Sequence, residues 1–285
     1  MELANETFRE LAGVIRAETG MVLGPEKAYL VHHRLEGLVR SEGLTGFEGL
    51  AQRLRVRTNV GLRKALIDAI TVKETRFFRD QAFFDALKDY VLPECASVLA
   101  RAGRGRQHLR VWSAAASTGQ EAYSVAMILR EFIETNPAER LDERRFSILA
   151  SDISDAAIDA ARAGLYSESE VGRGLSADRL KRYFAPRARQ WCIDESLRRN
   201  MQFRTLNLLD PPSDLGAFDL ILCRNVLIYF DAADRGRVCR WLFDLLHDGG
   251  WLALGSAESL HGLDDRFETI VMGKSILYQK PVRPN

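Results

Sequence analysis

The sequence predicts an α/β protein in which a small all-helical domain precedes a domain built on a largely parallel sheet. Apolar residues recur at helical spacing through about the first 70 residues. After them, short apolar runs typical of buried strands alternate with helical stretches, an order that produces a parallel sheet. A segment over residues 180–206 breaks this alternation and predicts a small antiparallel insertion.

The helical part extends from about residue 4 to residue 70. In its first helix, Phe8, Leu11 and Ile15 lie on one face, and later stretches repeat that spacing. Turns between the helices are indicated at Gly24-Pro25, at residues 43–46 and at Thr58-Asn59.

Apolar runs predict the strands of the main sheet, and the stretches between them predict helices. The strands are expected at residues 108–112, 146–150, 218–223 and 251–254, and the helices at 119–135, 153–163 and 231–247. The last helix is expected to begin with Asp231 as its N-cap and to stop at Gly249-Gly250. Ligands bind beyond the carboxyl ends of the strands in open sheets of this kind, so we expect the chemistry there.

The remaining segments complete the domain plan. Apolar clusters at 182–184, 191–193 and 201–203 form the expected insertion, and residues 267–271 with 275–278 predict a final hairpin that closes the sheet edge. We divide the chain into a helical domain at 1–72, a linker with the start of the second domain at 73–90, and the main domain at 91–285.

Composition excludes several classes of protein. A chain of 285 residues that is 46% hydrophobic buries a sizeable core. Forty Lys and Arg against 39 Asp and Glu give a net charge of +1, unlike a general nucleic-acid binder. No signal peptide or membrane span is evident, so we expect an unexported cytoplasmic protein without membrane insertion, and a monomer by default. The four cysteines lack metal-ligand spacing, so neither a metal site nor a disulfide is expected.

The turn at residues 113–121 follows the first strand and consists mostly of small residues. Such a turn lets a ligand approach backbone N–H groups, although it lacks the glycine pattern of dinucleotide sites and the P-loop pattern. A plain tight connection is the alternative. Glu121 either complements the helix dipole from the first turn or pairs with a ligand ammonium.

Asp152 ends the second strand, where a carboxylate can accept hydrogen bonds from both hydroxyls of a ribose. That placement favours adenosine over phosphate as the ligand group. The alternative role is to cap the helix that is expected to begin at Ile153.

Two further segments combine polar and apolar residues. At 223–231, the apolar residues are expected to pack in the core, whereas Arg224, Asn225 and Tyr229 at a strand tip are costly unless partnered or functional. At 75–80, the two phenylalanines suit interdomain packing. On the residues alone, Arg79 is expected to pair with Asp80 or another nearby acid at the surface.

Six motifs together resemble the CheR family of chemotaxis receptor methyltransferases, in the same order along the chain. They are T-x-F-F-R at 75–79, V-W-S-A-A-A-S-T-G-x-E at 111–121, S-D-I at 151–153, R-Y-F at 182–184, N-L-L at 207–209 and C-R-N-V-x-I-Y-F-D at 223–231.

This resemblance implies a Rossmann-like, S-adenosylmethionine-dependent methyltransferase domain with an inserted β-subdomain. It implies methyl esterification of glutamates in the cytoplasmic domain of chemotaxis-type receptors, with S-adenosylhomocysteine as product. Family members often have Asn two residues before the motif threonine, where this chain has Lys73. Arg79 and Tyr229 are implied to be catalytic residues beside the transferred methyl group, and the implied cofactor contacts are Thr75, Arg79, Glu121, Asp152, Asn207, Leu208, Arg224 and Asn225.

The implied reaction is an in-line displacement at the sulfonium methyl by a glutamate carboxylate. That carboxylate is already ionised near neutral pH, because an ordinary Glu titrates at about 4.3. No general base is then needed, and alignment of the reactants, which contributes roughly 7–11 kcal/mol in favourable systems, becomes the main task. Arg79 is expected to orient the carboxylate through a bidentate contact.

Substrate recognition is expected in the helical domain. Between residues 27 and 64, eight Lys or Arg stand against three Glu, which suits an acidic partner. The resemblance places Arg34 at a basic position of a helix that reads the receptor, whereas a solvated face remains open for Arg53, Arg55 and Arg57. The stretch 185–206 is shorter than in relatives that dock a receptor tail, so we expect tether-independent recognition.

Two rival functions share this fold. One is methylation of a nucleic acid or small molecule, because residues 225–229 superficially resemble N-P-P-Y, although the prolines are missing. The other is a module that senses S-adenosylmethionine or binds receptors without turnover. Retention of Arg79 and Tyr229 argues against the second.

Overall fold

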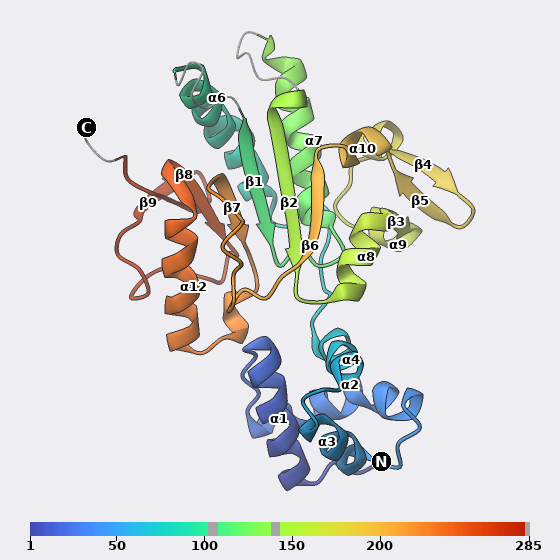
Figure 1. Ribbon diagram of the computed structural model, residues 1–285. Helices are drawn as coiled ribbons and strands as arrows, with labels where there is room; N and C mark the ends of the chain where they lie inside the picture. Colours follow the sequence, from blue (N-terminus) through green and yellow to red (C-terminus); the bar gives the residue numbers. More distant parts are fainter. Residues whose placement is uncertain (102–107, 138–142, 283–285) are drawn as a thin grey trace.

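The computed structural model describes residues 1–101, 108–137 and 143–282. Its N-terminal part consists of helices with a core of their own, as predicted. Figure 1 shows the arrowheads of the strands β1 (Leu109–Ala114) and β2 (Phe146–Asp152) pointing toward this part. No helix in the described ranges is long and apolar enough to cross a membrane. The helices are α1 (Asn5–Thr19), α2 (Ala28–Ser41), α3 (Phe47–Arg55) and α4 (Val60–Ile70), with a 3-10 turn at Pro25–Lys27.

The end of α1 illustrates how this domain meets the rest of the chain. Gly20 closes the helix in the left-handed conformation, with φ of 76°, which glycine adopts at little cost. A Cβ at this position would lie 2.3 Å from Leu209 Cδ1 and 3.1 Å from the Phe230 ring. The glycine therefore suits both the backbone angle at this position and the close contact with the second domain.

The second domain is built on a seven-stranded sheet of order β6-β2-β1-β7-β8-β10-β9. The strands from β6 to β8 in that order are parallel, and β10 runs antiparallel to β8 and β9 as the predicted final hairpin. The chain moves outward from β1 in both directions, an arrangement that opens a crevice at the carboxyl ends of the strands. The strands are β1 (Leu109–Ala114), β2 (Phe146–Asp152), β6 (Met201–Thr205), β7 (Phe218–Cys223), β8 (Leu246–Leu254), β9 (Glu268–Met272) and β10 (Ser275–Gln279).

Successive side chains of a strand point to opposite faces of the sheet, so the apolar residues of the sheet belong to two hydrophobic cores. Val111 and Leu222 belong to the core shared with α7 (Gln120–Thr135), whereas Trp112 and Ile221 belong to the core shared with α12 (Ala232–Asp244). The apolar runs are uninterrupted because both faces are covered. The helices that follow the linker are α5 (Gln81–Ala86), a π-helical turn at Leu87–Val91, α6 (Leu92–Arg101), α7 (Gln120–Thr135), α8 (Asp155–Ala163) and α12 (Ala232–Asp244).

The predicted end of the last helix was wrong. Asp231 is its N-cap, with the carboxylate accepting from the Asp234 N–H, but α12 ends at Asp244 and Gly249-Gly250 lie inside β8. The strand starts at Leu246 and has an irregular register opposite Phe218. Glycines commonly occupy such irregularities, so Gly249-Gly250 indicate a bulge in the strand here and not the end of a helix.

The predicted limits of the antiparallel insertion also need correction. Its three-stranded sheet has the order β3-β5-β4, with β3 already at Leu165–Ser167, so it begins before residue 180. The cluster at 201–203 belongs to β6, which pairs with β2 in the main sheet. A three-residue strand carries no readable period, and an edge strand of a parallel sheet has the same pattern as an antiparallel one. The other elements are β4 (Phe184–Arg187), β5 (Gln190–Ile193), α9 (Glu168–Val171), α10 (Ala177–Tyr183) and α11 (Glu195–Arg198).

Candidate functional site

A cleft of about 980 Å³ lies at the carboxyl ends of the parallel strands, where the helical domain faces the sheet. Its walls come from the end of α1, from the segment after α4 and from the loops that follow β1, β2, β6 and β7. Nine of the predicted site residues line it: Thr75, Arg79, Glu121, Asp152, Asn207, Leu208, Arg224, Asn225 and Tyr229.

Backbone strain is concentrated around this cleft. Six non-glycine residues of the described chain have φ above 0°, a conformation that L-residues rarely adopt. Ala115, Ser117 and Asn225 among them line the cleft, and Phe78 and Asp80 flank Arg79. The sixth, Ala188, lies in the β4–β5 hairpin. Strained residues persist where the surroundings hold them, and they gather at functional sites.

Asp152 connects the loops after β1 and β2. Its Oδ2 accepts from the Ser117 N–H at 2.8 Å and its Oδ1 from the Ser154 N–H at 3.0 Å. Burial raises the pKa of this carboxyl, and hydrogen bonds from the backbone oppose that rise. The alternative role, in which Asp152 caps a helix that begins at Ile153, was wrong, because α8 begins at Asp155 and its N-cap is Ser154.

Arg224 forms the centre of a charged cluster in the wall of the cleft, with a side chain only 1% exposed. Its Nη1 lies 3.0 Å from Glu121 Oε2, and its Nη2 lies 2.6 Å from Asp80 Oδ2 and donates to the Arg79 carbonyl at 3.2 Å. Glu121 Oε1 also accepts from the Ser113 hydroxyl at 2.8 Å. The cation at the strand tip is thus partnered by two carboxylates.

The cluster changes the expectation for Arg79. Asp80, its expected partner, forms an ion pair with Arg224 instead. The backbone of Asp80 is left-handed, with φ of 63°. The Arg79 side chain lines the cleft, and no hydrogen bond or ion pair joins it to the described part of the chain. Its guanidinium is therefore available to a ligand.

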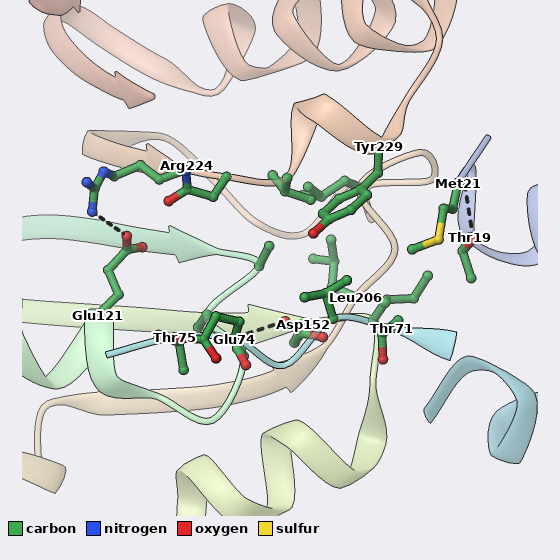
Figure 2. Close-up of a pocket in the computed structure, with 18 of the residues that line it drawn as sticks. Thr19, Met21, Thr71, Glu74, Thr75, Glu121, Asp152, Leu206, Arg224 and Tyr229 are labelled. Atoms are coloured by element: carbon green, nitrogen blue, oxygen red, sulfur yellow. Dashed lines mark hydrogen bonds and ion pairs between the residues drawn. The ribbon is translucent and has the colours of Figure 1, made fainter. Parts of the chain in front are cut away.

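Tyr229 ends the 3-10 turn Leu227–Tyr229. Figure 2 shows its ring projecting into the cleft toward the wall that carries Asp152 and Thr75. Burial raises the pKa of the phenol, whereas the charges of Arg34 and Arg79 lower it. Since the net direction is upward, the hydroxyl stays protonated at neutral pH and can donate a hydrogen bond.

The conformation of the Asn225 loop depends on Glu258, which the sequence patterns did not single out. The Glu258 carboxylate accepts from the N–H groups of Asn225 at 2.6 Å, Gly255 at 2.8 Å and Ile228 at 3.3 Å. A Cβ on Gly255 would lie 2.5 Å from Asn225 Nδ2. The only sequence signal was an acid shortly after the end of the last parallel strand.

The helical domain contributes to the cleft in a way that was also missed. Thr19 and Met21 line it, and Asn207 Nδ2 donates to the Glu18 carbonyl at 3.0 Å across the two domains. Asn207 Oδ1 accepts from the Leu209 N–H at 2.9 Å, so this side chain is already held by backbone groups.

Arg34 lies outside the cleft. Its Nη1 donates to the Ile70 carbonyl at 2.6 Å, at the end of α4, and the side chain is half-buried. Arg34 nevertheless lies within electrostatic reach of Tyr229.

Comparisons with known proteins agree with this architecture. The family model "CheR methyltransferase, all-alpha domain" matches residues 6–71, and "CheR methyltransferase, SAM binding domain" matches residues 73–276. Chemotaxis protein methyltransferase 1 of Pseudomonas aeruginosa is 40% identical over 280 residues, covering 98% of this chain and 99% of that protein. Chemotaxis protein methyltransferase 1 of Vibrio cholerae is 37% identical, covering 97% and 98%, and the chemotaxis protein methyltransferase of Escherichia coli is 34% identical, covering 94% and 89%.

Proposed function

Because the chain belongs to the CheR family of methyltransferases, we propose that it transfers the methyl group of S-adenosylmethionine to glutamate side chains of chemotaxis-type receptors. The product is a glutamyl methyl ester. The observation that carries the proposal is the Arg79 guanidinium, unpaired within the described chain, which lines a cleft together with the half-buried Asp152 carboxylate and the neutral Tyr229 hydroxyl.

The residues of the cleft fit S-adenosylmethionine. Its ribose carries a diol that suits the Asp152 carboxylate, and its ammonium suits Glu121, whose charge Arg224 already orients. The strained loop with Ala115 and Ser117 brings backbone close to a ligand. When bound, the sulfonium supplies an electrophilic methyl group. The other residues proposed to hold it are Thr75, Arg79, Asn207, Leu208, Arg224 and Asn225.

The receptor glutamate is the nucleophile in the proposed reaction. A carboxylate oxygen forms the new O–CH₃ bond as the S–CH₃ bond breaks, and no proton is transferred. Arg79 binds and orients the carboxylate, because a guanidinium matches its plane. Tyr229 donates a hydrogen bond that fixes the carboxylate at near-attack geometry. A hold that is too tight would stabilise the ground state and slow the attack.

We propose residues 1–72 as the part that recognises the receptor, and Arg34 as a contact. Six of the eight basic residues between positions 27 and 64 have partners within the described chain. Five of these partners are carboxylates, so the positive charge that is not offset is smaller than the sequence suggests. Arg34 contacts the Ile70 carbonyl, and the ion pairs are Arg40–Glu36, Arg53–Glu42, Arg55–Glu10, Arg63–Glu18 and Lys64–Asp155.

The deciding experiment is transfer of radiolabelled methyl from S-adenosylmethionine to receptor cytoplasmic fragments, with wild type compared to Arg79→Ala. The proposal expects label that base releases as methanol and that collapses in the variant. Base-stable label would reject ester chemistry. Cofactor binding without label on any fragment would favour a sensor.

A further inference from the structure

Arg179, on α10 of the inserted region, stacks on the residue that precedes Arg79. Its guanidinium carbon lies 3.9 Å from the centre of the Phe78 ring, and Phe78 is 5% exposed. We propose that Arg179 is a positioning residue that fixes the direction of Arg79 through Phe78. This inference rests on the proposed function, because it assigns Arg79 its task.

Phe78 needs such support because its backbone is strained. Its φ is 50°, in the left-handed region that bulky residues rarely adopt. The Phe78 N–H donates to Ser124 Oγ at 3.0 Å, which holds one side of the peptide. On the other side of Arg79, Asp80 is also left-handed and is held by Arg224. Arg79 therefore extends from a short segment whose two neighbours must both be held.

The stacked guanidinium is itself rigidly placed. Arg179 Nε donates to Glu131 Oε1 at 2.9 Å and Nη2 donates to Oε2 at 2.8 Å, a bidentate pair with α7. The two side chains are 22% and 18% exposed. A planar guanidinium fixed in this way presents one face to the aromatic ring, an arrangement that attracts the cation to the ring. Phe84 contacts the same ring edge-on, with centroids 5.0 Å apart.

The alternative is that Arg179 only stabilises the contact between α10 and α7. Arg182 provides a matched control for this alternative, because it pairs with Glu134 one turn later on the same two helices. Arg182 lies over the Tyr183 ring rather than Phe78, with side chains of the pair 47% and 42% exposed. Loss of Arg182 should weaken the helix contact without affecting the segment of Arg79.

The test compares Arg179→Gln with Arg182→Gln in the full chain. Turnover with a receptor fragment, affinity for S-adenosylhomocysteine by calorimetry and the thermal midpoint are measured for each. We expect Arg179→Gln to lower kcat by about tenfold to a hundredfold, the scale of a misplaced reactive group, and to weaken S-adenosylhomocysteine binding. Arg182→Gln should change either quantity by less than about threefold, within the ordinary effect of a surface substitution. Equal effects of the two variants overturn the inference.

A second comparison separates positioning from general loosening. In an Arg79→Lys background, Arg179→Gln should have little further effect on kcat, because residues acting through one another are non-additive. The same factor in both backgrounds contradicts the inference. If wild type itself gives no label on receptor fragments, the proposed function fails, and the affinity for S-adenosylhomocysteine alone decides the inference. The inference stands if only Arg179→Gln weakens this affinity. It falls if both variants weaken the affinity equally or leave it unchanged.

Discussion

Arg224 Nη1 and Glu121 Oε2 lie 3.0 Å apart in a pair whose arginine side chain is 1% exposed. The same guanidinium holds Asp80 at 2.6 Å, on the far side of Arg79. One buried cation therefore connects the start of α7, the strand tip after β7 and the segment before α5. Contacts within the chain thus fix these three charged groups relative to one another, which is the condition for electrostatic preorganisation.

Removal of that cation should be costly. Arg224→Ala leaves two largely buried carboxylates without their partner, so we expect a loss of about 3–5 kcal/mol in the free energy of unfolding. Arg237, which pairs with Asp234 at the surface of α12, is the matched control, and Arg237→Ala should lose less than about 0.5 kcal/mol. Urea unfolding of both variants measures the difference. Similar losses would show that the buried cluster is not a stabilising unit.

Asp152 should make cofactor affinity depend on pH. Burial raises its pKa, so the carboxyl takes up a proton at a higher pH than an ordinary aspartate. Ribose hydroxyls donate more strongly to the charged form. The affinity for S-adenosylhomocysteine should therefore rise with pH above about 4, the ordinary value, and reach a plateau once the carboxylate is ionised.

The contribution of Asp152 to folding stability depends on pH in the opposite direction to its contribution to binding. Between the ordinary and the raised pKa, the folded state binds more protons than the unfolded state, so Asp152 favours folding as pH falls.

Calorimetry across that pH window measures the affinity for S-adenosylhomocysteine. An Asp152→Asn variant should bind weakly without this pH dependence, and a variant that keeps the wild-type profile would falsify the assignment.

Glu258 should matter for cofactor binding although it does not line the cleft. In the folded protein, one Glu258 carboxylate oxygen accepts hydrogen bonds from the N–H groups of both Asn225 and Gly255. Glu258→Gln replaces the carboxylate by a neutral amide, so these hydrogen bonds are weakened or lost. Loss of a charge-assisted hydrogen bond is worth about 1.5–3 kcal/mol, so the Kd for S-adenosylhomocysteine should rise about tenfold to a hundredfold. Glu268→Gln, at an exposed position of β9, is the control and should bind as wild type. Equal Kd values would mean that the left-handed Asn225 holds its conformation unaided.

Gly20 offers a test of the contact between the domains. Gly20→Ala adds a Cβ that meets Leu209 Cδ1, whereas Gly43→Ala, at a similar φ of 65°, meets nothing within 4 Å. Both variants have the cost of a left-handed alanine, so their difference isolates the steric term. We expect Gly20→Ala to lose about 1–3 kcal/mol more in the free energy of unfolding. Matching urea midpoints would show that Leu209 yields without cost.

The sequence patterns predicted the elements that carry a long, regular signal. The helical period before residue 70 and the buried runs of β1, β2, β7 and β8 sufficed for the architecture, because each buries a continuous apolar face. The motifs named the residues that gather at the cleft. They failed at Gly249-Gly250 and at Leu165–Ser167, where a bulge and a three-residue strand have no period to read.

The partners of the site residues could not be predicted from local pattern. Asp80 and Arg224 are 144 positions apart, and Glu258 is 33 positions from Asn225. A carboxylate alone does not indicate which distant N–H or guanidinium it will meet. For the same reason we expected Arg79 to pair with Asp80 or another nearby acid, whereas in the fold Asp80 pairs with Arg224 and Arg79 lines the cleft.

Thr19 and Met21 close the cleft from a domain that has its own hydrophobic core. A molecule that fills the cleft is lined by residues of both domains. Its binding free energy is lost when either domain unfolds, so by linkage it protects both. Binding in the cleft should therefore make the unfolding of the helical domain and of the sheet domain more cooperative than their direct contacts alone do.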